Sequence, residues 1–172
     1  MAETLTTLKT RRSCRAYKDE LIEEEKLNAI LEAGTFAATG MGRQSPIIIA
    51  VTDRALRDKL SKMNAAVMGR DGDPFYGAPE LLIVLADKTV PTYLYDGSLV
   101  MGNMMNAAAD LGVANCWIHR AKEEFESAEG KAFLKSLGIE GDYEGIGHLI
   151  LGYAAAPLVE PKERKANYVY RV

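Results

Sequence analysis

A long stretch without a polar face constrains this fold more than any other feature of the sequence. One helix is predicted from about Tyr93 to Leu111, with glycine, alanine, methionine and other apolar residues on nearly every side. A helix that is apolar all round is buried, either in a large core or in a subunit interface. Because the chain has only 172 residues, we expect the interface, and therefore an obligate homodimer.

Composition excludes several classes of protein. A chain of 172 residues has the size of one domain, so we expect a single domain over residues 1–172. Its 21 Lys and Arg residues are outnumbered by 24 Asp and Glu residues, whereas a dedicated nucleic-acid binder carries a basic excess. No apolar run reaches the roughly 18 residues of a membrane-spanning helix. We expect neither a nucleic-acid nor a membrane partner.

Cysteine usage and the first residues of the chain indicate a compartment. Cys14 and Cys116 form no C-x-x-C pair, which is typical of a protein in a reducing environment. The opening stretch MAETLTTLKTRR is polar and lacks the apolar core of a signal peptide. We therefore expect a cytoplasmic protein.

Helix and strand patterns alternate along the chain and predict an α+β fold around one sheet. Helical spacing predicts four further helices: Thr4–Thr10, Glu23–Ala38, a helix capped by Asp53, and Ser127–Leu137. Apolar runs predict four strands: Ile47–Thr52, Leu81–Ala86, Val113–Ile118 and Ile146–Leu151. The run Ile47–Thr52 is continuous and β-branched, which is typical of a strand covered on both faces.

Finer patterns complete this prediction. The helix after Asp53 places four apolar residues on one face: Leu56, Leu60, Met63 and Val67. Glycine and proline mark loops at Thr39–Pro46 and Gly69–Gly77. The tail Ala154–Val172 is polar, and its last residues predict a final strand over Asn167–Val172.

The chain lacks the motifs of several common enzyme classes. It has no G-x-G-x-x-G fingerprint after a strand and no P-loop. His119 and His148 show no metal-ligand spacing, so we expect no metal, and no serine or cysteine lies in a nucleophile elbow. If the protein is an enzyme, its reactive atoms belong to a cofactor.

A basic cluster, Arg11-Arg12-Ser13-Cys14-Arg15, follows the first predicted helix. Three guanidinium groups and a hydroxyl within five residues suit a phosphate, because arginine makes bidentate, charge-assisted hydrogen bonds to it. A solvated basic patch explains the same residues. The cluster alone leaves both interpretations open.

Three other segments have the composition of ligand contacts. Glycines in Thr39–Pro46 allow a ligand to approach the backbone, although an ordinary turn also needs them. Cys116–Arg120 leaves a strand, where ligands often bind, but the same pattern fits three core residues followed by two surface residues. The basic residues of Lys162–Lys165 fit plain surface charge. None of these segments decides the function alone.

Taken in order, however, these pieces resemble the nitroreductase family of flavin enzymes, and most closely its short bacterial members. The resemblance runs from about Leu5 to Arg171. It rests on these segments: Arg11–Tyr17, Leu27–Ala33, Thr39–Pro46, Tyr76–Pro79, Asp96–Leu111, Cys116–Ile118, Leu151–Tyr153 and Pro161–Arg164.

The resemblance implies an architecture. It implies an α+β fold with a central, mostly antiparallel mixed sheet flanked by helices, which dimerises through its long central helix. Two FMN sites would lie at the interface, each built from both subunits. The C-terminal tail, about residues 154–172, would wrap onto the partner.

The resemblance also assigns residues to the FMN site. Positions that hold the phosphate, ribityl chain and pyrimidine edge are matched by Arg11, Arg12, Ser13 and Arg15. The loop that reaches the flavin from the partner subunit is matched by Thr39, Gly40, Gly42 and Gln44. The stretch that passes the isoalloxazine near N5 and O4 is matched by Ile118, His119 and Arg120. A basic pair that closes on the phosphate is matched by Lys162 and Arg164.

The sequence departs from the family in two segments. Gly42 and Pro46 stand where many members have asparagine and tryptophan. The stretch Asp71–Pro74 lacks the asparagine and lysine with which longer members touch the flavin. These departures concern the substrate and the cofactor affinity more than the flavin itself.

The resulting hypothesis is an FMN-dependent oxidoreductase that takes a hydride from NAD(P)H and passes it to a nitroaromatic, quinone or similar acceptor in a ping-pong cycle. Arg15 would stabilise charge near flavin N1 and O2, and His119 or Arg120 would contact the acceptor. One alternative is another flavin reaction on the same fold, such as dehydrogenation, dehalogenation or flavin breakdown. The other is a non-catalytic FMN-binding protein.

Overall fold

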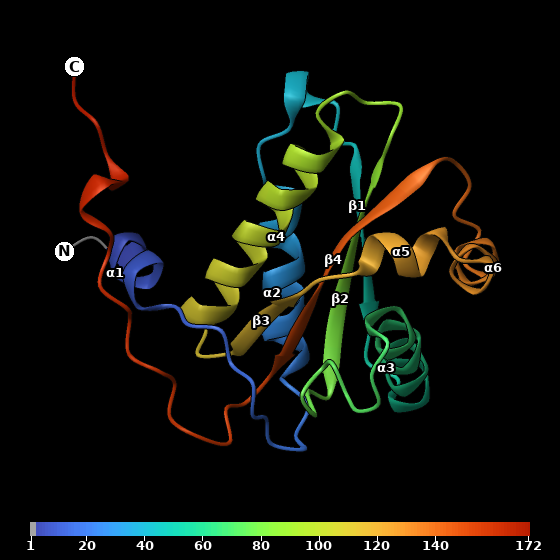
Figure 1. The fold of residues 1–172 in the computed structure, drawn as a ribbon, viewed down its shortest axis with the longest axis horizontal. Helices are drawn as coiled ribbons and strands as arrows, with labels where there is room; N and C mark the ends of the chain where they lie inside the picture. The colour runs from blue at the N-terminus through green and yellow to red at the C-terminus, as the bar shows by residue number, and fades with distance from the viewer. Residues whose placement is uncertain (1–2) are drawn as a thin grey trace.

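An antiparallel sheet separates two layers of helices in the computed structural model, which describes residues 3–172 (Figure 1). Its strands are β1 (Pro46–Val51), β2 (Glu80–Asp87), β3 (Ala114–Ile118) and β4 (Tyr143–Gly152), in the order β1-β2-β4-β3. All three strand pairings are antiparallel, so the expectation of a mixed sheet is wrong. The parallel contact in this region is an isolated bridge between Ser13 and Asn115, outside the four strands.

Strand β2 forms the centre of the core. Alternate side chains of a strand point to opposite faces of the sheet. Accordingly, Leu81, Ile83 and Leu85 pack into one apolar cluster, while Leu82 and Val84 pack into the other. Strand β2 is therefore buried on both faces, and the predicted strand Leu81–Ala86 is confirmed.

Strand β1 differs from this pattern. Its position is predicted to within one residue, but it is not covered on both faces: Pro46 to Ile49 are half-buried and Ala50 is exposed. The reason is its place at the end of the strand order, where it pairs only with β2 among the described residues. A β-branched run does not distinguish a central strand from an edge strand of this kind.

Two helices cover the first face of the sheet, α2 (Glu24–Thr35) and α4 (Tyr93–Asp110). They pack closely: a Cβ on Gly34 would lie 2.8 Å from the Cγ of Met104. Helix α4 confirms the predicted long helix, whereas α2 ends three residues before the predicted Ala38. Three apolar side chains of α4 face solvent in the single chain: Leu94, Tyr95 and Leu99.

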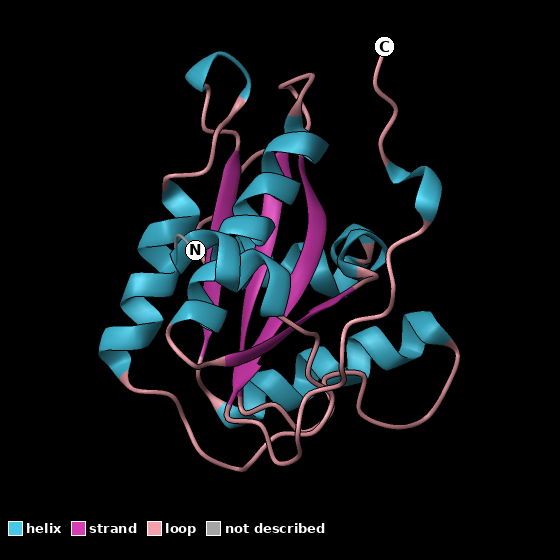
Figure 2. Ribbon diagram, turned by 90° about the vertical axis from the view of Figure 1, so that its left-hand side faces the viewer, coloured by secondary structure: helices cyan, strands magenta, loops and turns pink. Residues whose placement is uncertain are grey.

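The opposite face carries α3 (Arg54–Met68), α5 (Ala121–Glu126) and α6 (Ala128–Ser136) (Figure 2). Asp53 caps α3 as predicted, because its carboxylate accepts a hydrogen bond from the Leu56 amide at 2.7 Å. Leu60 and Met63 are buried, but Val67 is 38% exposed and does not belong to the buried face. Helix α5 has only six residues and lacks a periodic apolar pattern that would predict it.

The first described helix, which begins at Glu3, and the C-terminal tail lie on the same side of the molecule (Figure 1). Helix α1 (Glu3–Thr10) rests on the end of α4, where the Thr7 hydroxyl donates to Asp110 at 2.7 Å. The expected strand over Asn167–Val172 is absent; the single chain has a short 3₁₀ turn there, η2 (Ala166–Tyr168). These residues are exposed and have no neighbouring strand with which to pair. Among residues 3–172, no helix combines the length and apolarity needed to cross a bilayer.

The Asp53 cap gives a direct test of this fold. Replacing Asp53 by alanine removes the side-chain acceptor at the start of α3, so we expect the free energy of unfolding to fall by about 1 kcal/mol. For a chain of this length the Tm then drops by roughly 2–4 °C. Urea unfolding followed by circular dichroism measures the change. Asp53→Asn keeps an equivalent cap and should retain wild-type stability; equal losses in both variants would contradict the assignment.

Candidate functional site

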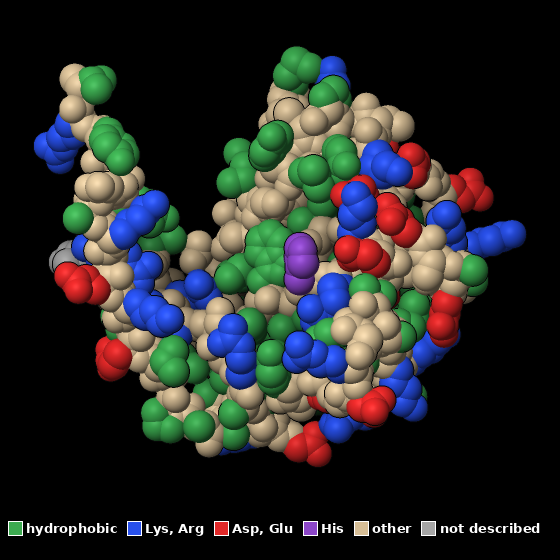
Figure 3. Space-filling view, in the orientation of Figure 1, with side chains coloured by type: hydrophobic (Ala, Val, Ile, Leu, Met, Phe, Trp, Pro, Cys, Tyr) green, Lys and Arg blue, Asp and Glu red, His purple; other side chains and the backbone are tan. Residues whose placement is uncertain are grey.

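A basic cavity of about 440 Å³ lies between the N-terminal arginine cluster and the C-terminal tail. Its wall includes Arg11, Arg12, Ser13 and Arg15 from one end of the chain and Val159–Lys165 with Tyr168 from the other. Figure 3 shows the surface hollowed between the tail and the body, with Lys and Arg side chains on the tail and at the base of the hollow. The fold thus brings together the two basic segments that lie more than a hundred residues apart in sequence.

Positive charge dominates this cavity. Six cationic side chains line it against two carboxylates, Glu160 and Glu163. Two partly buried guanidinium groups are incompletely bonded, since Nη1 of Arg11 and Nε of Arg12 have no hydrogen-bond partner among residues 3–172. Burial lowers the pKa of Arg11; Cys116 acts in the opposite direction, and neighbouring Arg12 lowers it further. A cavity with this excess of cations suits a polyanion.

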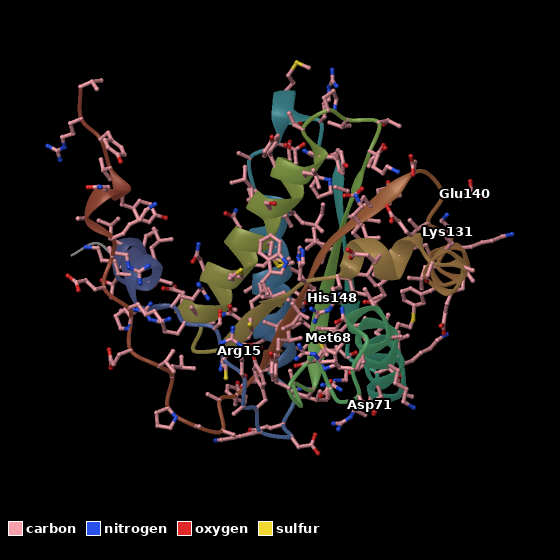
Figure 4. The ribbon with its side chains drawn as sticks, in the orientation of Figure 1. Arg15, Met68, Asp71, Lys131, Glu140 and His148 are labelled. Carbon is pink, nitrogen blue, oxygen red and sulfur yellow. The ribbon has the colours of Figure 1, made fainter. Side chains whose placement is uncertain are left out.

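The remaining bonds hold these arginines in place. Arg12 donates through Nη1 to the carbonyls of Lys9, at 2.8 Å, and of Arg11, at 2.6 Å, so part of its guanidinium caps the end of α1. Arg164 donates through Nη2 to its own chain at the Lys162 carbonyl, at 2.8 Å. Arg15 is exposed and lies on the loop that follows α1 (Figure 4).

The segment Thr39–Gln44 forms a second candidate group at the far end of α4. It contains the 3₁₀ turn η1 (Gly40–Gly42), and its Gly40 amide donates to the buried Asp96 carboxylate at 2.9 Å. Asp96 also accepts from Ser45 at 2.9 Å and from Thr92 at 3.0 Å. Burial raises the pKa of Asp96, but these three hydrogen bonds outweigh burial and leave the pKa lowered.

Close packing explains one glycine in this segment. A Cβ on Gly40 would lie 2.3 Å from the Thr92 hydroxyl oxygen, so a larger residue does not fit. Gly42 has no such neighbour, but its φ of +66° lies in the left-handed region that favours glycine. Thr39 accepts a hydrogen bond from the Gln44 amide at 3.1 Å, which closes the loop.

Helix α4 keeps these two groups apart in the single chain. Asp110 contacts α1 beside the arginine cluster, while Asp96 contacts Gly40. From Asp96 to Asp110 the α-helix rises about 21 Å. The structure therefore does not bring Thr39, Gly40, Gly42 and Gln44 together with the basic cavity inside one chain (Figure 1).

The third predicted group, Ile118–Arg120, lies at the end of β3 and lines neither of these regions. Ile118 is 6% exposed and packs into the core, His119 is exposed, and Arg120 is half-buried. The Arg120 Nε donates to the Asn64 side chain at 3.0 Å. Of the two histidines only His119 faces solvent, because His148 is fully buried (Figure 4).

Residues with a strained backbone conformation occur in the segments Thr39–Gln44 and Ile118–Arg120. Four non-glycine residues in 3–172 have positive φ: Met41, Gln44, Tyr76 and Arg120. Such conformations cost on the order of 1–3 kcal/mol each and cluster at functional sites. Three of the four lie in the predicted segments, and the fourth, Tyr76, has its ring 6.0 Å from the guanidinium carbon of Arg15.

Asp73 shapes the loop that carries Tyr76. Its carboxylate accepts from the amides of Phe75 and Gly77 and from Ser61, at 2.6–3.0 Å. It also pairs at 2.5 Å with Arg57, whose side chain is only 4% exposed. Sequence reasoning missed Asp73, Asp96 and Asn64, since a lone aspartate or asparagine in the sequence gives no sign that it will be placed among backbone amides.

No metal centre is evident. Within residues 3–172, no three side chains of His, Cys, Asp or Glu are placed to hold a metal ion. Both cysteines are buried and unpaired.

Comparison with known proteins identifies the family. Residues 8–75 match the model of the nitroreductase family. A protein of Archaeoglobus fulgidus, provisionally named NADH dehydrogenase/NAD(P)H nitroreductase, is 30% identical over 173 residues, which cover 98% of this chain and 91% of the relative. The chain therefore belongs to the nitroreductase family.

Solved structures agree with this assignment. The crystal structure of a nitroreductase with bound FMN from Bacteroides fragilis is 32% identical and superposes with a TM-score of 0.91 over the whole of both chains. A second nitroreductase with bound FMN, from Desulfitobacterium hafniense, is 30% identical with a TM-score of 0.89, over 100% of this chain and 99% of that one. The nitroreductase-like α+β fold is thus confirmed.

The Asp73 network predicts a pH dependence. Burial raises the pKa of Asp73, but hydrogen bonds from Arg57, Ser61 and two backbone amides outweigh burial and lower it overall. A lowered pKa means that the carboxylate stabilises the folded state at neutral pH, and that this contribution is lost as the pH falls through the folded-state pKa.

We therefore expect the Tm of Asp73→Asn to lie below that of the wild type at pH 7 and to converge with it as the pH falls through the lowered pKa of Asp73. Thermal melts across this range make the comparison. Asp71→Asn, an exposed neighbour in the same loop, is the matched control and should follow the wild-type curve. A constant difference between Asp73→Asn and wild type at every pH would contradict the role of the charge.

Proposed function

We propose that this protein is an FMN-dependent oxidoreductase that uses NAD(P)H, and that the basic cavity holds the FMN phosphate. The observation that supports the proposal most is the excess of positive charge around that cavity, where six cationic side chains from both ends of the chain face two carboxylates. A phosphate offers oxygens that satisfy such donors. Membership of a family with FMN-bound structures supports the same cofactor.

The donor set fits this group chemically. Arg11 and Arg12 approach from the end of α1, and Lys162 and Arg164 approach from the tail. A phosphate dianion between them relieves the repulsion of like charges on both sides. Ser13 adds a hydroxyl donor beside the arginines. These residues are the proposed phosphate and ribityl contacts.

The remaining residues act on the ring and on the substrates. When bound, FMN supplies the hydride chemistry, taking a hydride from NAD(P)H and giving it to a second acceptor. Arg15 supplies a cation that favours negative charge at the pyrimidine edge of the ring. The exposed His119 and the half-buried Arg120 contact the acceptor. A nitroaromatic or a quinone is the proposed acceptor class.

We also propose that the working unit is a homodimer. The loop Thr39–Gln44 lies about 21 Å along α4 from the arginine end, so a second copy that runs along α4 in the opposite direction supplies it to the site. The exposed Leu94, Tyr95 and Leu99 give α4 an apolar outer face for that contact. Beyond Ala155, which bonds to Ala16, the tail to residue 172 is exposed and has apolar side chains that can wrap onto the partner.

The function is tested by absorbance and reduction of the purified protein. We expect a yellow protein, or a colourless one that becomes yellow with added FMN, whose flavin is bleached anaerobically by NADH or NADPH and restored by a quinone. A bound flavin that neither nicotinamide reduces would favour another flavin reaction or a non-catalytic protein. Failure to bind FMN at all would reject the cofactor.

The phosphate contacts are tested in the same assay. Arg11→Ala and Arg164→Ala each remove charge-assisted bonds worth about 1.5–3 kcal/mol, so the Kd for FMN should rise about 10- to 100-fold. Fluorescence quenching of FMN measures the Kd, and thermal melts show that the fold is intact. Arg54→Ala is the control, since Arg54 is exposed and pairs with Asp19 and Asp58 away from the cavity. Unchanged FMN affinity in Arg11→Ala and Arg164→Ala would show that the FMN phosphate does not bind in this cavity.

The dimer is tested by sedimentation. Leu99→Glu places a charge on the outer face of α4, where Leu99 is 50% exposed in the single chain. We expect the wild type to sediment as a dimer at micromolar concentration and Leu99→Glu to sediment as a monomer with weakened FMN binding. Leu137→Glu, at a leucine with 48% exposure at the end of α6, should remain dimeric. A monomeric wild type would reject the proposal.

A further inference from the structure

A fully buried amide lies beneath the Ile118–Arg120 segment. Asn64, on the sheet-facing side of α3, has no exposed surface. A buried amide is expensive to leave unpaired, so its hydrogen bonds decide where its neighbours lie. Every hydrogen bond that Asn64 makes through its side chain is to a residue from His119 to Glu124.

The side chain of Asn64 bonds both to the backbone and to the side chain of the His119–Arg120 segment. Its Nδ2 donates to the His119 carbonyl at 3.0 Å. Its Oδ1 accepts from the Arg120 Nε, also at 3.0 Å. One side chain therefore fixes both the backbone carbonyl before Arg120 and the guanidinium group of Arg120.

The backbone conformation at Arg120 is strained and depends on such contacts. Arg120 has φ 77° and ψ 6°, the left-handed conformation, which only glycine adopts without strain. The same residue forms the N-cap position of α5 and makes no side-chain cap there. The observed conformation persists because neighbouring contacts impose it.

A buried carboxylate holds Asn64 in turn. The Glu124 carboxylate is 1% exposed, and its Oε2 accepts from Asn64 Nδ2 at 3.1 Å. The same oxygen lies 3.2 Å from Nε2 of the fully buried His148. His148 packs beside Phe75 and Phe125, with ring centroids 5.2 and 6.1 Å away, where β4 passes α5 (Figure 4). The buried Glu124 carboxylate therefore helps to orient the Asn64 amide.

We propose that Asn64 is a positioning residue: it holds the strained His119–Arg120 peptide in the place from which this segment contacts the flavin ring and the acceptor. The contact with the ring rests on the proposed function; the hold on the peptide does not. Asn64 lies under the segment and acts through it, so its loss should change the surroundings of the flavin without removing any group that binds the phosphate.

The test uses Asn64→Ala and Asn64→Ser in the full-length protein. Serine is the milder change, because its hydroxyl bonds to the carbonyl of the preceding turn of its own helix but is too short to reach His119. Asp53→Ala is the matched control, since it weakens the same helix at its start, far from Asn64. If Asn64→Ala does not fold, the serine variant carries the comparison.

The first measurement needs no FMN. Hydrogen exchange of the flavin-free protein should be about tenfold faster at the amides of residues 119–124 in both Asn64 variants, and unchanged there in Asp53→Ala. Unchanged local exchange in the Asn64 variants would overturn the proposal, whatever FMN does.

The second measurement reports on the flavin. We expect the visible circular dichroism and the midpoint potential of bound FMN to shift in the Asn64 variants and to match the wild type in Asp53→Ala. Wild-type flavin signals in Asn64 variants whose Tm has fallen would show that Asn64 is merely structural. If the wild type binds no FMN, the proposed function fails, and the exchange measurement still decides whether Asn64 holds the peptide.

Discussion

The rest of the candidate site depends on positive charge that the chain does not neutralise by itself. The protein is acidic overall, with a formal net charge of −3, yet it gathers six cations around one cavity. The sheet makes this possible, because the Cys14 amide donates to the Asn115 carbonyl at 2.9 Å and fixes the arginine segment beside β3. Backbone hydrogen bonds therefore hold this segment in place against the repulsion between the cations, and a bound anion would reduce that repulsion.

Local chemistry made much of this structure predictable. The α3 cap at Asp53, the length of α4 and the buried centre of β2 follow from patterns within a few residues. The arginine cluster and the basic tail were also visible, but only the fold shows that one cavity collects them. The edge position of β1 could not be predicted, because a run of isoleucines is the same at an edge and at the centre. Asp96 and Asn64 were missed because their partners lie 56 and 55 residues away in sequence.

Helix α3 supports both the loop that carries Tyr76 and the Ile118–Arg120 segment, which lie far apart in sequence. Arg57, Ser61 and Asn64 are all buried on it, at spacings that place them on one helical face. The first two hold Asp73 and the loop that carries Tyr76, and the third accepts a hydrogen bond from Arg120. One polar face in an apolar core thus supports two strained turns. This arrangement explains why a helix that lines neither the basic cavity nor the Thr39–Gln44 region contains three buried polar side chains.

The open edge of β1 has a consequence for the lone chain. Isoleucines 47–49 are half-buried, and their strand pairs on one side only within residues 3–172. An unprotected apolar edge is a template on which further strands can add, and natural proteins suppress it with charges, proline or a covering segment. Pro46 stands at the start of this strand, but no Lys, Arg, Asp or Glu lies within it. A chain that folds alone is thus exposed to edge-to-edge aggregation, and whatever covers β1 acts as a safeguard of solubility.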